Sequence, residues 1–192
     1  QDKRLCRHLH LPLQSGSDAV LKRMGRGYDT AHFAKAADAF RRHAPNGAFT
    51  TDVIVGFPGE TDREFDETCR FCQQMDFAGI HVFQYSPRKG TVASRMPDQV
   101  PPPIKKQRSD AMLALAAESA LRYRRRFLGQ VLDTLYETDN AAGSNRLWEG
   151  TTDNYLRVLT RSEEDIGNKL LPTRLIGDRT GGLLGELATV PS

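Results

Sequence analysis

Two histidines and an aspartate are the first candidates for chemistry in this 192-residue sequence. His8 and His10 stand two residues apart in the alternating stretch HLHLPLQSG, so on a strand both imidazoles project from one face. Asp52, on the next strand-like stretch, could add a carboxylate, and such a set is typical of zinc-dependent hydrolases. The other histidines lie on a helix pattern or within a strand. Because two histidines on a polar strand face are more often hydrogen-bonded lining, we predict no metal ligand and keep the zinc hydrolase as an alternative.

The three cysteines are Cys6, Cys69 and Cys72, too few and of the wrong number for a disulfide framework, which favours a reducing cytoplasm. Cys69 and Cys72 have the spacing of a redox or metal-binding pair. However, they share a helix stripe with Phe65 and Met75, away from the helix start where a thiol pKa is lowered. We predict that both are inert and buried.

The stretch VIVGFPGET is where an apolar strand enters a glycine-rich turn. Gly56 and Gly59 carry no Cβ, so a ligand can approach the backbone closely. We expect free amides at the start of the following helix, with Glu60 beside them. Such a site suits a ligand that has both an amine and a carboxylate.

Alternating strands and helices position these candidates in the first half of the chain. Strand patterns occupy residues 8–14, 49–58 and 79–87, and helix patterns begin at Ser17, Thr30 and Thr61, the last with a capping box to Glu64. This order predicts a parallel sheet with ligands at the carboxyl ends of its strands. A long helix follows over about 104–126. Short strand patterns separated by Gly, Asn and Asp then predict a small β-barrel that begins near residue 127.

Charge is unevenly distributed along the chain, which has a net charge of +3. Residues 1–87 are neutral, residues 88–126 carry +7 and residues 127–192 carry −4. The basic block favours an anionic partner, with nucleic acid first, and a solvated helix face is the alternative. No apolar run has membrane-spanning length. The sequence lacks an initiator Met and passes directly from a charged stub into a strand, so we expect a fragment of a longer protein.

Long phrases of the sequence, in order along the chain, resemble one family. They are HLHLPLQSGSDAVLKRMGRGYD, TTDVIVGFPGETDREFDET, HVFQYSPRKGTVASRMPDQVPPPIKKQR and the terminal DNYLRV and LLGEL. The family is the radical S-adenosylmethionine (SAM) methylthiotransferases, which add a methylthio group to a tRNA adenosine beside the anticodon or to a ribosomal protein. CRHLHLPLQSG and HVFQYSPRKGT are most similar to the branch that modifies C2 of N6-threonylcarbamoyladenosine. The isopentenyladenosine and ribosomal-protein branches stay open as alternatives.

The resemblance implies an α/β fold in two parts. Residues 1–126 would be the carboxyl-terminal part of a radical SAM (β/α) barrel with its closing helix, and residues 127–192 a small RNA-binding β-barrel of the TRAM or OB-like type. The resemblance places these residues near SAM: Gln14, Ser15, Asp52, Ile54, Gly56, Phe83 and Tyr85. The resemblance and the basic block together suggest that the following residues contact RNA: Arg88, Lys89, Arg124, Arg125, Arg126, Tyr155, Arg157 and Arg174. The acidic tail departs from the family, so its RNA contacts would come from a local patch.

One motif of the family is absent from this sequence. The family holds a [4Fe–4S] cluster on a Cys-x3-Cys-x2-Cys loop and a second cluster on an upstream domain, and the three cysteines here are spaced differently. We therefore expect a fragment of a cytoplasmic transferase that has no catalytic residue of its own and is inactive alone. Its parent would use SAM, iron–sulfur clusters, an electron donor and tRNA, and no membrane. A non-catalytic RNA-binding module and the zinc hydrolase built on His8 and His10 are the alternatives.

Overall fold

A computed structural model describes residues 5–139 and 146–188, and these divide into two compact units. The sheet unit is Leu9–Ala120, and the barrel unit combines residues 5–8 with the described residues from Leu121 onward. The division therefore falls within the long helix, before the boundary at 126/127 that the sequence suggests. Among the described helices, none combines the length and apolar character needed to cross a membrane.

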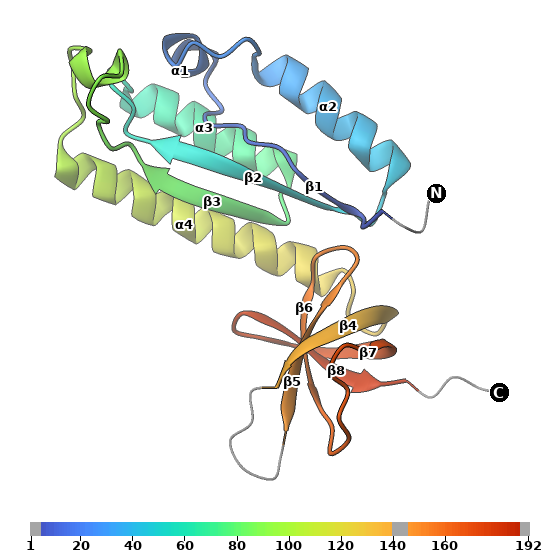
Figure 1. Cartoon of the computed structure of the whole chain (residues 1–192). Helices are drawn as coiled ribbons and strands as arrows, with labels where there is room; N and C mark the ends of the chain where they lie inside the picture. The colour runs from blue at the N-terminus through green and yellow to red at the C-terminus, as the bar shows by residue number, and fades with distance from the viewer. Residues whose placement is uncertain (1–4, 140–145, 189–192) are drawn as a thin grey trace. The chain divides into compact units, whose positions relative to one another are not determined.

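Three parallel strands form the centre of the sheet unit, as the sequence predicts. β1 (His8–His10), β2 (Ala48–Val55) and β3 (Gly79–Gln84) lie in the order β1-β2-β3 (Figure 1). β1 is shorter than the predicted strand, which contains Pro12, a residue without an amide to donate. Pairing resumes at Gln14, whose amide donates to the carbonyl of Asp52 at 2.8 Å.

Four helices accompany the strands, with bounds near those predicted. They are α1 (Asp18–Arg23), α2 (Thr30–His43), α3 (Asp62–Met75) and α4 (Pro102–Arg125), and a short 3-10 turn, η1, spans Ala93–Arg95. The capping box between Thr61 and Glu64 is present at the start of α3. Ser17 precedes α1 without a side-chain cap, because its hydroxyl donates to Glu67 instead.

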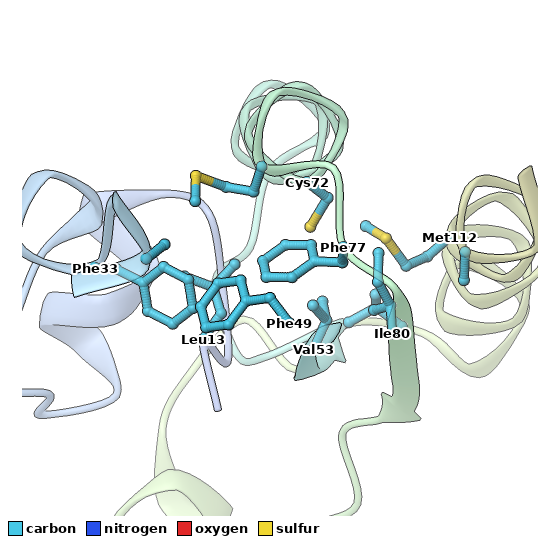
Figure 2. Close-up of a cluster of buried hydrophobic side chains, with 12 residues drawn as sticks. Leu13, Phe33, Phe49, Val53, Cys72, Phe77, Ile80 and Met112 are labelled. Carbon is cyan, nitrogen blue, oxygen red and sulfur yellow. The ribbon is translucent and has the colours of Figure 1, made fainter. Parts of the chain in front are cut away.

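The helices cover one face of the sheet through a continuous apolar core. Every second residue of β2 from Thr51 to Val55 is buried, as strand alternation requires. Figure 2 shows this core, in which aromatic rings meet side chains from α2, α3 and α4. Its labelled members are Leu13, Phe33, Phe49, Val53, Cys72, Phe77, Ile80 and Met112. The opposite face of the sheet is left for polar and exposed side chains.

The barrel unit closes five strands on one another. They are β4 (Val131–Asp139), β5 (Leu147–Thr152), β6 (Arg157–Arg161), β7 (Leu170–Arg179) and β8 (Gly182–Leu187), in the closed order β4-β5-β6-β8-β7. A small closed barrel is therefore confirmed. Its centre is partly polar, because the Tyr136 hydroxyl lies 2.7 Å from Thr160 Oγ1 and 2.9 Å from Thr173 Oγ1.

Candidate functional site

A pocket of about 600 Å³ opens on the face of the sheet that the helices leave uncovered. It is lined by Gln14, Met24, Arg26, Asp52, Ile54, Phe57, Phe83, Gln84, Tyr85, Ser86, Arg88, Thr91 and Ala93. Apolar and aromatic side chains make up much of the wall, and two arginines and one aspartate add charge. A cavity of this size with a few converging polar groups is what a small-molecule site requires.

Strand register explains why distant residues meet in this pocket. Asp52 pairs with His81 and Ile54 with Phe83 across the parallel β2–β3 ladder, so their side chains share the uncovered face. The pocket also takes residues just beyond β3, including Tyr85. It lies toward the carboxyl ends of the strands, where ligands bind in open α/β sheets.

Gln14 has an unusual backbone conformation at the edge of the pocket. Its φ of 70° is left-handed, which is uncommon for a residue other than glycine. The backbone holds this shape through two bonds to β2, from its own amide to Asp52 and from the Ile54 amide to its carbonyl. Its side chain accepts a hydrogen bond from Arg26 Nη2 at 3.1 Å. Gln14 and Arg26 therefore form one fixed wall.

The expectation of free amides in the turn after β2 is wrong. The Gly56 amide donates to Glu60 Oε2 at 2.7 Å, and the Thr61 and Glu64 amides are engaged in the capping box. Arg108 Nη1 holds the same Glu60 oxygen at 2.8 Å, and the Glu60 side chain is only 1% exposed. Burial raises the pKa of Glu60, against the lowering effect of these bonds. The turn is thus locked by internal contacts.

Two predicted ligand residues lie outside the pocket lining. Gly56 has φ +73° and faces Lys105, so closely that a Cβ would lie 2.3 Å from Lys105 Cγ. Lys105 Nζ in turn donates to the Tyr85 carbonyl at 3.1 Å. Ser15 is fully buried, and its hydroxyl lies 3.1 Å from that of Thr68. Both residues support the wall from behind, because their free space is filled by protein.

A salt bridge joins α1 to α3 beside the same turn. Arg23 Nη2 lies 2.7 Å from Glu64 Oε2, and it also donates to the Gly59 carbonyl at 3.2 Å. The hydrogen bonds from Arg23 are the main cause that lowers the pKa of Glu64 to about 2. Glu64 is therefore ionised at neutral pH and fixes the end of the turn.

The cysteines have the character expected of packing residues. Burial raises the pKa of Cys69 to about 11 and that of Cys72 to about 12. Cys72 is buried, Cys69 is half-buried and Cys6 is exposed. Thiols with raised pKa values are poor metal ligands and nucleophiles at neutral pH. The two helix cysteines therefore do not fit a cluster.

The residues predicted to bind RNA belong to both units. Arg88 lines the pocket of the sheet unit, and Lys89 is exposed beside it in sequence. In the barrel unit, three of the arginines have internal acceptors: Arg124 on Asp178, Arg157 on Glu149, and Arg174 on the Gly129 carbonyl. Arg126 lies over the rings of Tyr123 and Phe127, whereas Arg125 is exposed. Tyr155 is 57% exposed and has a left-handed φ of 63°.

The histidine grouping differs from the one that the sequence suggests. His8 leaves the sheet face and stacks on Tyr155 within the barrel unit, with ring centroids 4.1 Å apart. His81, which the sequence placed inside a strand and set aside, lies beside His10 and Asp52. His81 was missed because only the register of β3 against β2 brings it there. Arg26 was missed because it lies in the connection between α1 and α2, where no periodic pattern indicates which way a side chain points.

Comparisons with known proteins show what the chain is similar to in sequence and in fold. Residues 2–90 match the family model described as the Radical SAM superfamily. A solved structure titled as coproporphyrinogen III oxidase from Escherichia coli, a radical SAM enzyme, aligns with a TM-score of 0.51 at 14% identity. It covers 77% of this chain and 41% of that chain. At this identity the likeness concerns the fold.

Curated relatives are similar over most of the chain. A threonylcarbamoyladenosine tRNA methylthiotransferase is 39% identical in Bacillus subtilis, over 90% of this chain and 39% of that protein. Its counterpart in Thermotoga maritima is 46% identical over 71% of this chain and 32% of that protein. A tRNA-2-methylthio-N(6)-dimethylallyladenosine synthase of Syntrophotalea carbinolica is 40% identical over 95% of this chain and 42% of that protein. The chain thus spans about a third to two fifths of the length of these relatives.

Proposed function

We propose that this chain is part of a radical SAM tRNA methylthiotransferase and that its pocket binds SAM and the target adenosine; the match to the Radical SAM superfamily over residues 2–90 and the similarity to curated tRNA methylthiotransferases support this. One observation carries the proposal. Five of the predicted ligand residues, from three separate segments, line the same pocket: Gln14, Asp52, Ile54, Phe83 and Tyr85. Strand alternation and the pairing of β2 with β3 bring Asp52, Ile54 and Phe83 to this pocket.

The chemistry of the pocket wall suits SAM. Ile54, Phe57 and Phe83 offer apolar surface to an adenine ring, whereas Arg26 and Asp52 offer opposite charges to the carboxylate and amine of the methionine part. The Tyr85 hydroxyl is buried and has no hydrogen-bond partner among the described residues. Such an unpaired group favours a ligand that accepts or donates a bond there. SAM, when bound, supplies the methyl group and the radical chemistry of the family.

An iron–sulfur cluster does not fit the cysteines of this chain. Cys69 and Cys72 are core thiols with raised pKa values, and Cys6 belongs with the barrel unit. We propose that the cluster ligands and the electron donor of the working enzyme come from outside these 192 residues. On this proposal the stretch alone binds SAM without cleaving it.

For the nucleoside we propose N6-threonylcarbamoyladenosine. Two of the similar relatives carry this substrate in their names, although the dimethylallyladenosine relative is as similar. The pocket favours threonylcarbamoyladenosine because Arg88, with Ser86 and Thr91, suits the carboxylate and hydroxyl of a threonylcarbamoyl group. An isopentenyl group would leave these polar side chains without partners.

The barrel unit is proposed as an RNA-binding module of the TRAM type. Support comes from its closed five-stranded barrel and the exposed ring of Tyr155, since aromatic rings stack on unpaired bases. A protein that modifies tRNA in this way would work in the cytoplasm. A purely RNA-binding, non-catalytic role for the parent is less well supported, because it leaves the pocket unexplained.

Two measurements test the proposal. Calorimetric titration of the chain with SAM should show one site, and Phe83→Ala should weaken it about tenfold, as expected for loss of a ring that stacks on a base. Leu170→Ala, at a 63% exposed position of the barrel unit, is the control and should leave binding unchanged. Unchanged binding in Phe83→Ala would contradict the assigned pocket.

The nucleoside is tested in cells. Mass spectrometry of tRNA nucleosides from cells with and without the gene should show loss of the 2-methylthio form of threonylcarbamoyladenosine. Loss of the methylthio-isopentenyl nucleoside instead would move the enzyme to the other branch. An unchanged tRNA profile would reject tRNA as the substrate.

A further inference from the structure

A second constellation lies on the uncovered face of the sheet, beside the pocket. His10 on β1, Asp52 on β2 and His81 on β3 follow one another across the sheet, and their nitrogen and oxygen atoms lie within 4.8 Å of one another. Asp52 Oδ2 is 3.3 Å from His10 Nε2, and Asp52 Oδ1 is 3.1 Å from His81 Nδ1. The two imidazole rings stack with centroids 5.5 Å apart.

These separations are those of neighbouring ligands around one metal ion. Zinc bonds to histidine nitrogen and carboxylate oxygen are about 2.0–2.2 Å long, which puts two ligand atoms of a tetrahedron roughly 3.3 Å apart. Both contacts of Asp52 are close to this length, and they use its two different oxygens, Oδ2 toward His10 and Oδ1 toward His81, so one ion would be held by both oxygens of the carboxylate. The ligand nitrogens of the two histidines lie within 4.8 Å of one another, and the His81 side chain, 59% exposed, has room to rotate toward His10.

His10 also has a hydrogen-bonding partner of the kind that orients histidine ligands in metal sites. Its Nδ1 lies 3.0 Å from the hydroxyl of Thr50, so the ring is fixed with Nε2 toward Asp52. In metal sites the second ring nitrogen of a ligating histidine is commonly held in this way. Thr50 is buried and stands two residues before Asp52 on β2, so the same strand places the ligand and its support.

We propose that His10, Asp52 and His81 bind one divalent transition-metal ion of the zinc type. Two imidazoles and one carboxylate are a ligand set that zinc, cobalt and nickel accept, and it leaves at least one coordination position open. Asp52 also lines the pocket, so the proposed metal site adjoins it. The site contains no thiolate and needs no iron–sulfur cluster, but it shares Asp52 with the proposed SAM pocket, so a metal ion and the amine of SAM would compete for that carboxylate. A water or a ligand in the pocket can complete the coordination of the metal.

Cobalt(II) is the probe, because its bound form in a site with few ligands absorbs visible light. Titration of the whole chain should show saturable binding of one equivalent, and zinc(II) should displace the cobalt. Asp52→Asn and His81→Ala should each weaken binding at least tenfold. Thr50→Val, which keeps the volume and removes the support, should weaken it by about tenfold.

Matched controls separate this site from other metal-binding groups. His43→Ala changes an exposed histidine of α2 whose Nδ1 lies against the Ala39 carbonyl, and Cys6→Ser removes the exposed thiol. Both variants should still bind one equivalent of cobalt(II). Circular dichroism of every metal-free variant checks that it is folded.

Nuclear magnetic resonance gives a readout that needs no variant. Cobalt(II) at one equivalent should broaden the ring signals of His10 and His81 and leave those of His32 and His43 sharp. Uniform broadening, or cobalt binding that Asp52→Asn leaves unchanged, would overturn the proposal. The three groups would then be a hydrogen-bonded network alone.

Discussion

The residues predicted to bind ligands have different surroundings on the uncovered face of the sheet unit and on the surface of the barrel unit. On the sheet, five of the seven residues that the family resemblance places near SAM line one pocket, and alternation along the strands with pairing between them explains why Asp52, Ile54 and Phe83 share its face. In the barrel unit, Arg124, Arg157 and Arg174 were chosen for their charge, and each has an acceptor within the same unit. Periodicity predicts position, whereas charge alone does not predict availability.

The two units also use different interiors. The sheet unit packs aromatic and aliphatic side chains around Phe77, which stacks on Phe49 with ring centroids 5.4 Å apart. The barrel unit surrounds the hydroxyl of Tyr136 with those of Thr160 and Thr173. Cavity formation therefore dominates the cost of mutation in the first, and unpaired polar groups dominate it in the second.

The largest expected effect is that of Phe77→Ala. Phe77 is fully buried and is central in the cluster of Figure 2, so its loss removes apolar contacts and leaves a cavity. We expect the free energy of unfolding of the sheet unit to fall by about 3–5 kcal/mol. Urea unfolding followed by helical circular dichroism measures this, since α1, α2 and α3 belong to that unit. Leu113→Ala, half-exposed on α4, is the control and should cost far less.

Tyr136→Phe is the counterpart in the barrel unit. It keeps the ring and removes one hydroxyl, so Thr160 and Thr173 lose a partner at a cost of about 1–3 kcal/mol. Trp148, the sole tryptophan of the chain, is buried in the same cluster and reports barrel unfolding by fluorescence. A larger loss in Tyr136→Phe than in Phe77→Ala would contradict the distinction between the two interiors.

Local patterns predicted much of the fold. The capping box at Thr61, the buried stripe through Cys72 and Met75, and the parallel order of strands all follow from residues within one element or its neighbour. The lock on the turn after β2 could not be predicted in this way. It depends on Arg108, a residue of α4 far along the chain that reaches Glu60.

The candidate site, like the fold, was predictable only where it depends on local patterns. The resemblance to a known family placed Gln14, Asp52 and Phe83 near SAM, and strand parity, a local property, agrees with it by putting Asp52 and Phe83 on one face of the sheet. The meeting of His81 with Asp52 required the exact pairing of β3 with β2, which composition and spacing do not contain. The stacking of His8 on Tyr155 joins residues from opposite ends of the chain, and no periodic pattern signals it.

A smaller effect is expected at the salt bridge beside the pocket. Glu64→Gln keeps the shape of the capping box and removes the charge that Arg23 holds, so we expect a loss of about 1 kcal/mol at pH 7. The pKa of Glu64 is lowered from 4.5 to about 2 in the folded state. Its contribution is therefore complete above pH 4.5 and is lost as the pH falls toward 2.

Denaturant unfolding of both proteins at pH 7, 4 and 3 measures this dependence. The difference between them should shrink as the pH falls. Glu149→Gln is the counterpart in the barrel unit, where Arg157 is 51% exposed, and it should cost less because water screens the pair. A difference for Glu64→Gln that stays constant down to pH 3 would show that its charge does not stabilise the fold.

The smallest effect tests which arginines of the barrel unit are available to RNA. Arg125 is exposed, whereas Arg157 is held by Glu149. If the unit binds tRNA as proposed, Arg125→Ala should weaken binding modestly and reduce the slope of log affinity against log salt by about 0.7–0.9, the value for one phosphate contact. Arg157→Ala should reduce the slope less, because its charge is already neutralised within the protein. Filter binding of unmodified tRNA at four salt concentrations gives both slopes. Equal slopes for the two variants would mean that the Arg157–Glu149 pair opens on RNA, and charge alone would then have been a sufficient guide.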